Sequence, residues 1–371
     1  MKLSPSRPNA LTSRNEGKAR LSVLHPYLEE RLKEIQTGLY PRQHLWGIDG
    51  LKTLKNVEVE HLCSNSIFLP SVLEKLLNRA FFRNSPGAKA EISALRASKR
   101  SELIYSVCGP LSLLPLFGKA KLVSWVFRQP PGDAHGVFSP YREEKLKAHA
   151  AFLCLTERCV EFFSPHAPSK FMPWCVDLKI FDGNPPKEKP KEPFFLAAGK
   201  TGRDFETLIE AARQVKPKIR IIGPKEHKPA NLPANVSWLD CSNDPPDKAI
   251  DYPTLREWYA QCTAVCIPLS GDREDTCGYT NMLEGMAMAK PVIMTRSGCL
   301  HLDPESRGFG FLTSPNSYRE WAEKINLLAR NEDLAIKLGK NGRAIAEEEF
   351  SGKRFDADLS RFFEKLLSTI K

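Results

Sequence analysis

Residues 278–293 of this 371-residue sequence, GYTNMLEGMAMAKPVI, place a glycine directly before a helical run. The run is rich in Met and Ala and ends at Lys290-Pro291, before an apolar segment. The first turn of a helix has unpaired N–H groups and a partial positive charge, and Gly278 lets an anion come close to the backbone. The stretch therefore predicts a phosphate site at a helix start near Thr280.

Glu284 lies one turn further along the same predicted helix. A carboxylate there cannot serve a phosphate, but it can accept hydrogen bonds from a neutral diol such as a ribose. A diphosphate on the N–H groups and a ribose on Glu284 together describe a bound nucleotide. The alternative is that Glu284 is a solvated surface carboxylate and that the helix only packs on a sheet; the local pattern leaves both interpretations open.

Residues 196–212, LAAGKTGRDFETLIEAA, form the second stretch with chemical potential: a strand, a short loop and a helix. Lys200 and Arg203 flank the loop at the end of the strand. Two cations there can neutralise a leaving diphosphate. The alternative is two ordinary exposed bases.

Short apolar runs alternate with helical segments along most of the chain, and this alternation must position both stretches. The first half has the strand candidates RLSVLH, VEVEHL, ELIYSV, KLVSWVF, AFLCL and KFMPW, with helices predicted over 42–54, 73–82 and 141–150. After the Pro- and charge-rich stretch 181–194, the strand candidates are FFLAAG, IRIIG, NVSWLD, AVCIPL and PVIMT, and the chain is nearly all helix from 317. This order predicts two parallel sheets wound by helices, with a ligand cleft at the carboxyl ends of their strands.

The net charge of +10 is concentrated in the first half of the chain. Residues 1–185 contain 26 Lys and Arg against 17 Asp and Glu, a net charge of +9. The excess predicts an acidic partner, either an anionic membrane surface or a phosphate-bearing acceptor; the alternative is a solvated basic face. A nucleic-acid partner is excluded because no helix-turn-helix, zinc-finger or aromatic-basic pattern is present. A nicotinamide-dependent oxidoreductase is excluded because no G-x-G-x-x-G follows the first strand of either half.

The ten cysteines include no C-x-x-C pair, and most lie inside apolar runs. They indicate buried thiols of a reducing cytoplasm rather than disulfides or a zinc site. Residues 1–18 lack the apolar core of a signal peptide, and the longest uncharged run, 104–117, is too short to span a membrane. We expect a cytoplasmic protein with peripheral contact at the inner membrane face.

These motifs, taken in order, resemble the GT-B glycosyltransferases of the large retaining, nucleotide-sugar-dependent class called glycosyl transferases group 1. The resemblance is strong over residues 171–355 and weaker over 21–170. It is carried by FMPWCVDLKIF, AAGKTGRDFETLIEAA, IRIIGP, LREWYAQCTAVCIPLS, GYTNMLEGMAMAKPVIMT and GKNGRAIAEEEFS. The implied fold is α/β, with two Rossmann-like doubly wound domains facing a central cleft.

The resemblance also implies roles for single residues. Glu284 matches the carboxylate that holds the donor ribose, and Lys200 and Arg203 match the basic pair that stabilises the leaving nucleoside diphosphate. The backbone at the start of the helix matches the diphosphate site, and the donor-binding set there is Thr276, Gly278, Tyr279, Thr280, Asn281 and Met282. With these charges supplied by the protein, neither a metal nor another cofactor is required.

The implied activity is transfer of a hexose from a nucleotide-diphosphate sugar, with retention of configuration, to a glycan, lipid or small-molecule acceptor. Thr276 stands where the family often has a second glutamate, and Arg128 and His135 are the candidates for the histidine that many members place near the reacting sugar. These departures leave open a second class, a catalytically impaired nucleotide-sugar-binding protein with a regulatory or assembly role.

The predicted organisation has five parts. Residues 1–18 are a disordered lead-in, 19–183 an acceptor-binding domain, 184–193 a linker and 194–353 the nucleotide-sugar-binding domain. Residues 354–371 are a C-terminal helix that the resemblance places against the N-terminal domain.

Overall fold

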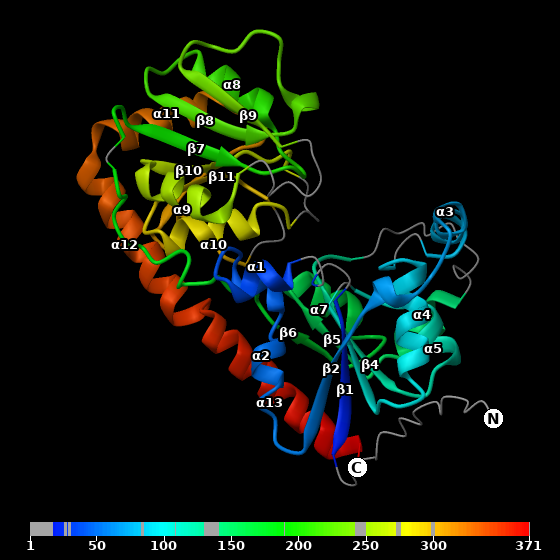
Figure 1. The fold of residues 1–371 in the computed structure, drawn as a ribbon. Helices are drawn as coiled ribbons and strands as arrows, with labels where there is room; N and C mark the ends of the chain where they lie inside the picture. The colour runs from blue at the N-terminus through cyan, green and yellow to red at the C-terminus, as the bar shows by residue number, and fades with distance from the viewer. Residues whose placement is uncertain are drawn as a thin grey trace, which may run out of the picture.

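The computed structural model of the chain describes residues 18–25, 28, 31–82, 85–107, 109–129, 141–188, 190–241, 250–271, 276–297 and 301–370. Its named strands form two six-stranded sheets, one in each half of the chain (Figure 1). Every pairing between neighbouring strands is parallel. The predicted α/β class with two wound parallel sheets is therefore confirmed.

The N-terminal sheet has the strand order β2-β1-β3-β4-β5-β6. Its strands are β1 (Ala19–Leu24), β2 (Val57–Leu62), β3 (Leu103–Ser106), β4 (Lys121–Val126), β5 (Ala151–Cys154) and β6 (Ser169–Phe171). The α-helices of this half are α1 (Leu32–Gln36), α2 (Ile48–Leu51), α3 (Ser71–Ala80), α4 (Ala88–Ala97), α5 (Leu113–Phe117), α6 (Arg142–Lys147) and α7 (Glu157–Phe163). Among its described residues this half also has two short 3-10 helices, η1 (Arg42–Leu45) and η2 (Ser64–Ser66).

The C-terminal sheet has the strand order β12-β11-β10-β7-β8-β9. Its strands are β7 (Phe194–Ala198), β8 (Lys218–Gly223), β9 (Val236–Asp240), β10 (Ala264–Ile267), β11 (Val292–Thr295) and β12 (Gly310–Thr313). Its helices are α8 (Phe205–Ala212), η4 (Lys225–His227), α9 (Tyr252–Gln261), α10 (Tyr279–Ala287), α11 (Tyr318–Arg330) and α12 (Glu332–Glu349). The chain ends with α13 (Gly352–Ile370).

Strands in the middle of each sheet are buried on both faces, which explains why they read as continuous apolar runs in the sequence, unlike the edge strands β2 and β9. In β7, Phe194 and Leu196 join one hydrophobic cluster while Phe195 and Ala197 join another on the opposite face. All five residues of this strand are buried. Alternating side chains thus hold one layer of helices on each face.

Two local predictions were wrong. Residues 42–54 form η1 and α2 rather than one helix, because Trp46 and Gly47 both have positive φ, 51° and 80°. A side chain at Gly47 would place its Cβ 2.2 Å from Leu359 of α13, so the break brings this segment close to the last helix. Strand β12 was also not predicted from the sequence, and its Gly310 lies so close to β11 that a Cβ would meet the Val292 carbonyl oxygen at 2.0 Å.

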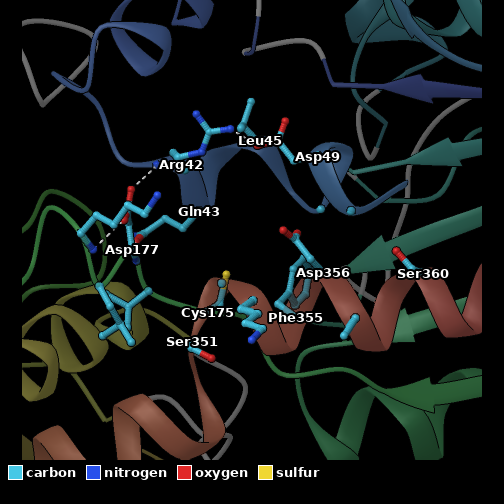
Figure 2. A pocket seen from close by; sticks show the side chains of 18 of the residues that line it. Arg42, Gln43, Leu45, Asp49, Cys175, Asp177, Ser351, Phe355, Asp356 and Ser360 are labelled. Carbon is cyan, nitrogen blue, oxygen red and sulfur yellow. Dashed lines mark hydrogen bonds and ion pairs between the residues drawn. The ribbon is translucent and has the colours of Figure 1, made fainter. Parts of the chain in front are cut away.

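The two halves are joined along one side of the molecule by α12 and α13, which follow one another across both sheets (Figure 1). In the N-terminal half α13 packs against α2, and Phe363 contacts Tyr105 of β3 with ring centroids 5.2 Å apart. Figure 2 shows the region where the chain passes into α13, with a cavity of about 610 Å³ between η1, α2 and the start of that helix. There the N–H of Arg42 donates to Asp177 at 2.8 Å, and the N–H of Asp177 donates to the Gln43 side chain at 2.6 Å. These bonds fix η1 against the connection between the two sheets.

The Pro- and charge-rich stretch 181–194, which contains the predicted linker 184–193, is bonded to α9. Asp182 forms an ion pair with Arg256, and the N–H of Lys187 donates to Glu257 at 2.7 Å. Gln261 donates to the carbonyl of Glu188 at 3.1 Å. In the described part of the chain no helix is both long and apolar enough to cross a membrane.

Candidate active site

A cavity of about 810 Å³ lies between the two sheets and is lined from both halves of the chain. The carboxyl ends of β1, β4, β7, β8 and β9 all lead into it. Its lining includes most of the residues singled out from the sequence, namely Arg128, Lys200, Arg203, Thr276, Gly278, Tyr279, Thr280, Asn281 and Glu284. This is the position at which open parallel sheets bind ligands.

The start of α10 forms part of the cavity surface. Gly278 precedes the helix with a φ of +86°, and a Cβ there would lie 2.5 Å from the Ile267 side chain of β10. Glycine is therefore required both by conformation and by contact. The first N–H used within the helix is that of Met282, which donates to the Gly278 carbonyl at 2.9 Å. The N–H groups of Tyr279, Thr280 and Asn281 have no partner inside the helix and are the groups that this end offers to an anion.

Glu284 is buried, with 2% of its surface exposed, so the interpretation as a solvated surface carboxylate is wrong. The hydroxyl of Tyr259 donates to its Oε2 at 2.9 Å, and the amide nitrogen of Asn281 donates to the same hydroxyl at 3.1 Å. Burial raises the pKa of Glu284 to about 8. Burial, and secondarily the neighbouring Glu284, hold the pKa of Tyr259 well above its usual range.

The raised pKa of Glu284 changes what this side chain does in the unliganded cavity. At neutral pH the carboxyl is mainly protonated, and it keeps both a donor and an acceptor for a diol. It also carries little charge that would repel an anion at the nearby helix start. The side chain can therefore hold a ribose beside a diphosphate without strong charge conflict.

Arg203 connects the loop after β7 to α10. Its guanidinium donates to the Asn281 side-chain oxygen at 2.6 Å and to the carbonyls of Thr201 and Ala198 at 2.9 and 3.3 Å. The guanidinium lies directly over Gly199, where a Cβ would come within 2.4 Å of it. Lys200 is half-buried on the same loop and lines the same cavity. The loop therefore presents two cations beside the start of α10.

We call Lys200, Arg203, Asn281 and Glu284 the C-terminal wall of the cavity. One chain of hydrogen bonds runs through it, from Arg203 through Asn281 and Tyr259 to Glu284. Tyr259 itself is fully buried behind the wall. Each member of this chain is therefore held in place by its neighbours.

On the opposite side of the cavity, we call the ring-bearing residues His25, His44, Trp46, Phe127 and Trp174 the N-terminal wall; the same half also contributes Arg31 and Arg128 to the lining. Trp46 and Trp174 stack with centroids 4.5 Å apart and planes 5° apart. Phe127 meets Trp46 edge-on at 5.3 Å and is 38% exposed. This wall is aromatic, a surface on which an apolar ligand face can stack.

The two histidines of this wall are uncharged at neutral pH. Burial lowers the pKa of His25 to about 4, and burial, with His25 and Arg31 nearby, lowers the pKa of His44 to about 3. The His25 Nε2 lies 2.8 Å from the His44 carbonyl, so Nε2 carries the proton and Nδ1 is an acceptor. That buried Nδ1 has no hydrogen-bond partner among the described residues.

Three predicted site residues need separate comment. Met282 is fully buried, does not line the cavity and has its N–H bonded within the helix, so it offers no group to a diphosphate, contrary to its expected role. Arg128 is exposed at the cavity edge after β4. His135 lies outside the described residues.

Tyr259, His25, His44 and the aromatic residues around them were not predicted from the sequence. His25 had a usable signal, since it is the last residue of the strand candidate RLSVLH and so had to lie at a carboxyl end of the sheet. Tyr259 had none, because an aromatic residue in an amphipathic helix reads as core. His44 and Trp46 depend on the break in residues 42–54, which the pattern did not indicate.

Residues 192–331 match a family model described as Glycosyl transferases group 1. Among curated proteins, the chain is 26% identical over 176 residues to "Uncharacterized glycosyltransferase MJ1178" of Methanocaldococcus jannaschii. The match covers 46% of this chain and 47% of that protein, so the chain spans about half the length of this relative.

Solved structures extend the likeness to nearly the whole chain. Sucrose-phosphate synthase from Thermosynechococcus elongatus matches with a TM-score of 0.65 at 14% identity, covering 95% of this chain and 100% of that chain. Anabaena Alr3699/HepE in complex with UDP-glucose matches with a TM-score of 0.57 at 15% identity, covering 93% and 99%. At this level of identity the likeness establishes the fold, and the predicted GT-B arrangement of two domains is confirmed.

Proposed function

We propose that this chain, a member of the glycosyl transferases group 1 with the GT-B fold, transfers a hexose from a nucleoside diphosphate sugar to an acceptor hydroxyl with retention of configuration. The single observation that carries the proposal is the C-terminal wall. It joins the open end of α10, two cations and a buried carboxyl in one cavity of about 810 Å³. These are the groups that a diphosphate and its ribose need.

In this proposal the N–H groups at the start of α10 bind the diphosphate, and Lys200 and Arg203 lie beside it. As the bond between the anomeric carbon and the diphosphate oxygen breaks, the electron pair stays on the diphosphate. The two cations stabilise that charge, which is greater in the transition state than in the bound donor. The acceptor hydroxyl forms the new bond to the anomeric carbon, and its proton leaves with the diphosphate.

Glu284 is proposed to bind the ribose, with Tyr259 holding its carboxyl in place. The acceptor would lie against the N-terminal wall, whose aromatic surface suits the apolar face of a sugar ring or an alkyl chain. The lowered pKa values of His25 and His44 keep these two side chains uncharged at neutral pH. The eight described cysteines are free thiols, which supports a reducing compartment such as the cytoplasm.

UDP-glucose is the first donor to test, because the similar Anabaena structure is a complex with it. Calorimetric titrations would use UDP-glucose, its ADP, GDP and dTDP counterparts and the free diphosphates. Tight binding of one diphosphate, weakened in Glu284→Ala and unchanged in Glu210→Ala, is the expected result. Glu210 is a suitable control because it is exposed on α8, away from the cavity. No binding of any nucleotide would overturn the proposal.

Transfer is tested separately from binding, by release of the diphosphate with a panel of glycan, lipid and small-molecule acceptors. We expect release to continue in EDTA, because Lys200 and Arg203 supply the positive charge. The configuration at the anomeric carbon of the product, read by NMR, tests retention. Donor binding without transfer or slow donor hydrolysis would instead favour the impaired nucleotide-sugar-binding protein.

A further inference from the structure

The apolar side of helix α3 faces away from the protein. This helix has ten residues, Ser71–Ala80, and none of them is buried. Ten large hydrophobic side chains are exposed in the described part of the chain, and four of them lie in and just before α3. Their exposed fractions are 92% for Phe68, 70% for Val72, 43% for Leu73 and 60% for Leu76.

The polar side of α3, not its apolar side, holds the helix to the protein. Asn78 accepts a hydrogen bond from the N–H of Ala88, at the start of α4, at 2.7 Å. Glu74 forms an ion pair with Lys89 of α4 at 2.9 Å. At 100° per residue, Glu74 and Asn78 lie on the side opposite Val72, Leu73 and Leu76. An amphipathic surface helix ordinarily buries the apolar side, so the orientation of α3 needs an external partner.

The charges beside the apolar side indicate which partner this is. Lys75 and Arg79 are exposed, lie one turn apart next to Val72 and Leu76, and form no ion pair with any described residue. The one acid of α3, Glu74, is already paired. The outward side is therefore apolar and cationic, in a half of the chain with a net charge of +9.

The position of α3 relates this surface to the cavity. Helix α3 follows β2, the edge strand of a parallel sheet, and projects from the outer edge of the N-terminal half (Figure 1). The carboxyl ends of β1 and β4 open into the cavity at the same edge of that sheet. A flat partner bound by α3 would therefore lie on the cavity side of the sheet.

We propose that Phe68 and α3 form a docking surface for an anionic lipid bilayer. Val72, Leu73 and Leu76 enter the boundary between headgroups and acyl chains, and Lys75 and Arg79 lie at the level of the lipid phosphates. The bilayer satisfies both features at once, because it offers apolar depth and negative charge over an extended plane.

The test is co-sedimentation of the full chain with vesicles of equal parts phosphatidylcholine and phosphatidylglycerol, and with vesicles of phosphatidylcholine alone. We expect binding to the anionic vesicles that weakens as salt is raised. Lys75→Gln with Arg79→Gln should lower the affinity about 25-fold, because each basic residue near an anionic surface contributes about fivefold. Val72→Ser with Leu76→Ser should lower it by at least about tenfold.

The matched control replaces exposed apolar residues elsewhere. Leu327 and Ile336 are 38% and 45% exposed on α11 and α12 of the C-terminal half, and Leu327→Ser with Ile336→Ser should leave vesicle binding unchanged. Because all four apolar substitutions are at exposed positions, the variants should fold, which thermal unfolding checks. Vesicle binding needs no sugar transfer. The docking proposal can therefore fail while the proposed activity holds, and the proposed activity can fail while vesicle binding is observed.

Three outcomes would overturn the docking proposal. One is no binding to either vesicle at low salt. Another is binding that the α3 variants and the control reduce equally. The third is a chain that forms dimers in solution, loses them in Val72→Ser with Leu76→Ser and does not bind vesicles, since α3 would then be covered by a second copy.

Discussion

The two walls of the cavity differ in the kind of interaction they offer. The C-terminal wall joins Arg203, Asn281 and Glu284 through hydrogen bonds, with Tyr259 behind it. The N-terminal wall is built from stacked rings, and burial removes the charge from its histidines. In the proposed reaction this difference divides the work: the C-terminal wall stabilises the charged leaving group, and the N-terminal wall receives the acceptor.

This division also explains why the walls depend on different parts of the sequence. The groups of the C-terminal wall come from two continuous stretches, each a strand end followed by a helix start. The residues of the N-terminal wall come from four separate segments of the chain, around positions 25, 44–46, 127 and 174. A charged site can be built locally, whereas a shaped aromatic surface needs the whole domain.

The largest expected effect is at the charged wall. Arg203→Ala removes the cation nearest to the start of α10 and should lower kcat/KM by about 10²–10³-fold, the usual cost of losing one electrostatic stabiliser of a leaving group. Arg203→Lys keeps the positive charge but loses the planar guanidinium with its several N–H donors, and we expect an intermediate loss of kcat/KM. Steady-state kinetics with the donor identified by titration provide the measurement.

Arg213→Ala is the matched control for this substitution. Arg213 follows α8, pairs with the exposed Glu210 and does not line the cavity. Its replacement should change kcat/KM less than about twofold. If Arg203→Ala behaves like Arg213→Ala, the two walls do not differ in the way argued above.

The next effect concerns the buried carboxyl and the pH dependence of stability. The folded chain keeps the proton of Glu284 up to about pH 8, while an unfolded glutamate releases it near 4.5. Between these values the folded state binds more protons, so the free energy of unfolding falls as pH rises. This contribution is fully present below about pH 4.5 and is lost as pH rises through about 8.

Glu284→Gln lacks this titration. The difference between its free energy of unfolding and that of the wild type should therefore shift in favour of the variant as pH rises across that range. The gain is several kcal/mol at most, at about 1.4 kcal/mol per pH unit. Urea unfolding at a series of pH values measures it. Glu210→Gln should follow the wild-type profile, and parallel profiles for Glu284→Gln and wild type would mean that Glu284 is ionised in the folded chain.

A smaller effect is expected for the hydroxyl that joins Asn281 to Glu284. Tyr259→Phe leaves the packing of the ring but removes both hydrogen bonds, so it should cost about 1–3 kcal/mol of stability and weaken donor binding about tenfold. Tyr318→Phe, on α11 outside the cavity, should do neither. A loss of stability with unchanged donor affinity would mean that Tyr259 stabilises the fold but does not contribute to donor binding.

Much of the fold could be predicted because its central strands are buried on both faces. Strands such as β7 are continuous apolar runs, and they stand out from the amphipathic helices that cover them. The break at Trp46 and the strand β12 could not be predicted. The first depends on the contact of Gly47 with α13, and the second on the close approach of Gly310 to Val292. The first contact joins distant parts of the chain, and the second joins two neighbouring strands through the packed sheet rather than through a local pattern.

The candidate site divides in the same way. The helix start at Gly278 and the pair Lys200 and Arg203 were predicted from local pattern, and the structure brings all three to one cavity. The burial of Glu284, which raises its pKa, could not be read from the sequence, because it depends on Tyr259 of another helix. Local patterns thus reveal which groups are present, and their ionisation requires the packed structure.

The smallest effect is expected at the aromatic wall, where Phe127→Ala tests whether that wall receives the acceptor. Phe127 is partly exposed and leans edge-on against Trp46 and Trp125, so its removal should cost little stability. It should raise the KM for the acceptor about fivefold, the equivalent of about 1 kcal/mol of stacking, and leave donor affinity unchanged. Phe117→Ala, which is 66% exposed on α5 and outside the cavity, is the matched control. A rise in donor Kd with an unchanged acceptor KM would reverse the assignment, because the ring would then belong to the donor site and both walls would serve the same ligand.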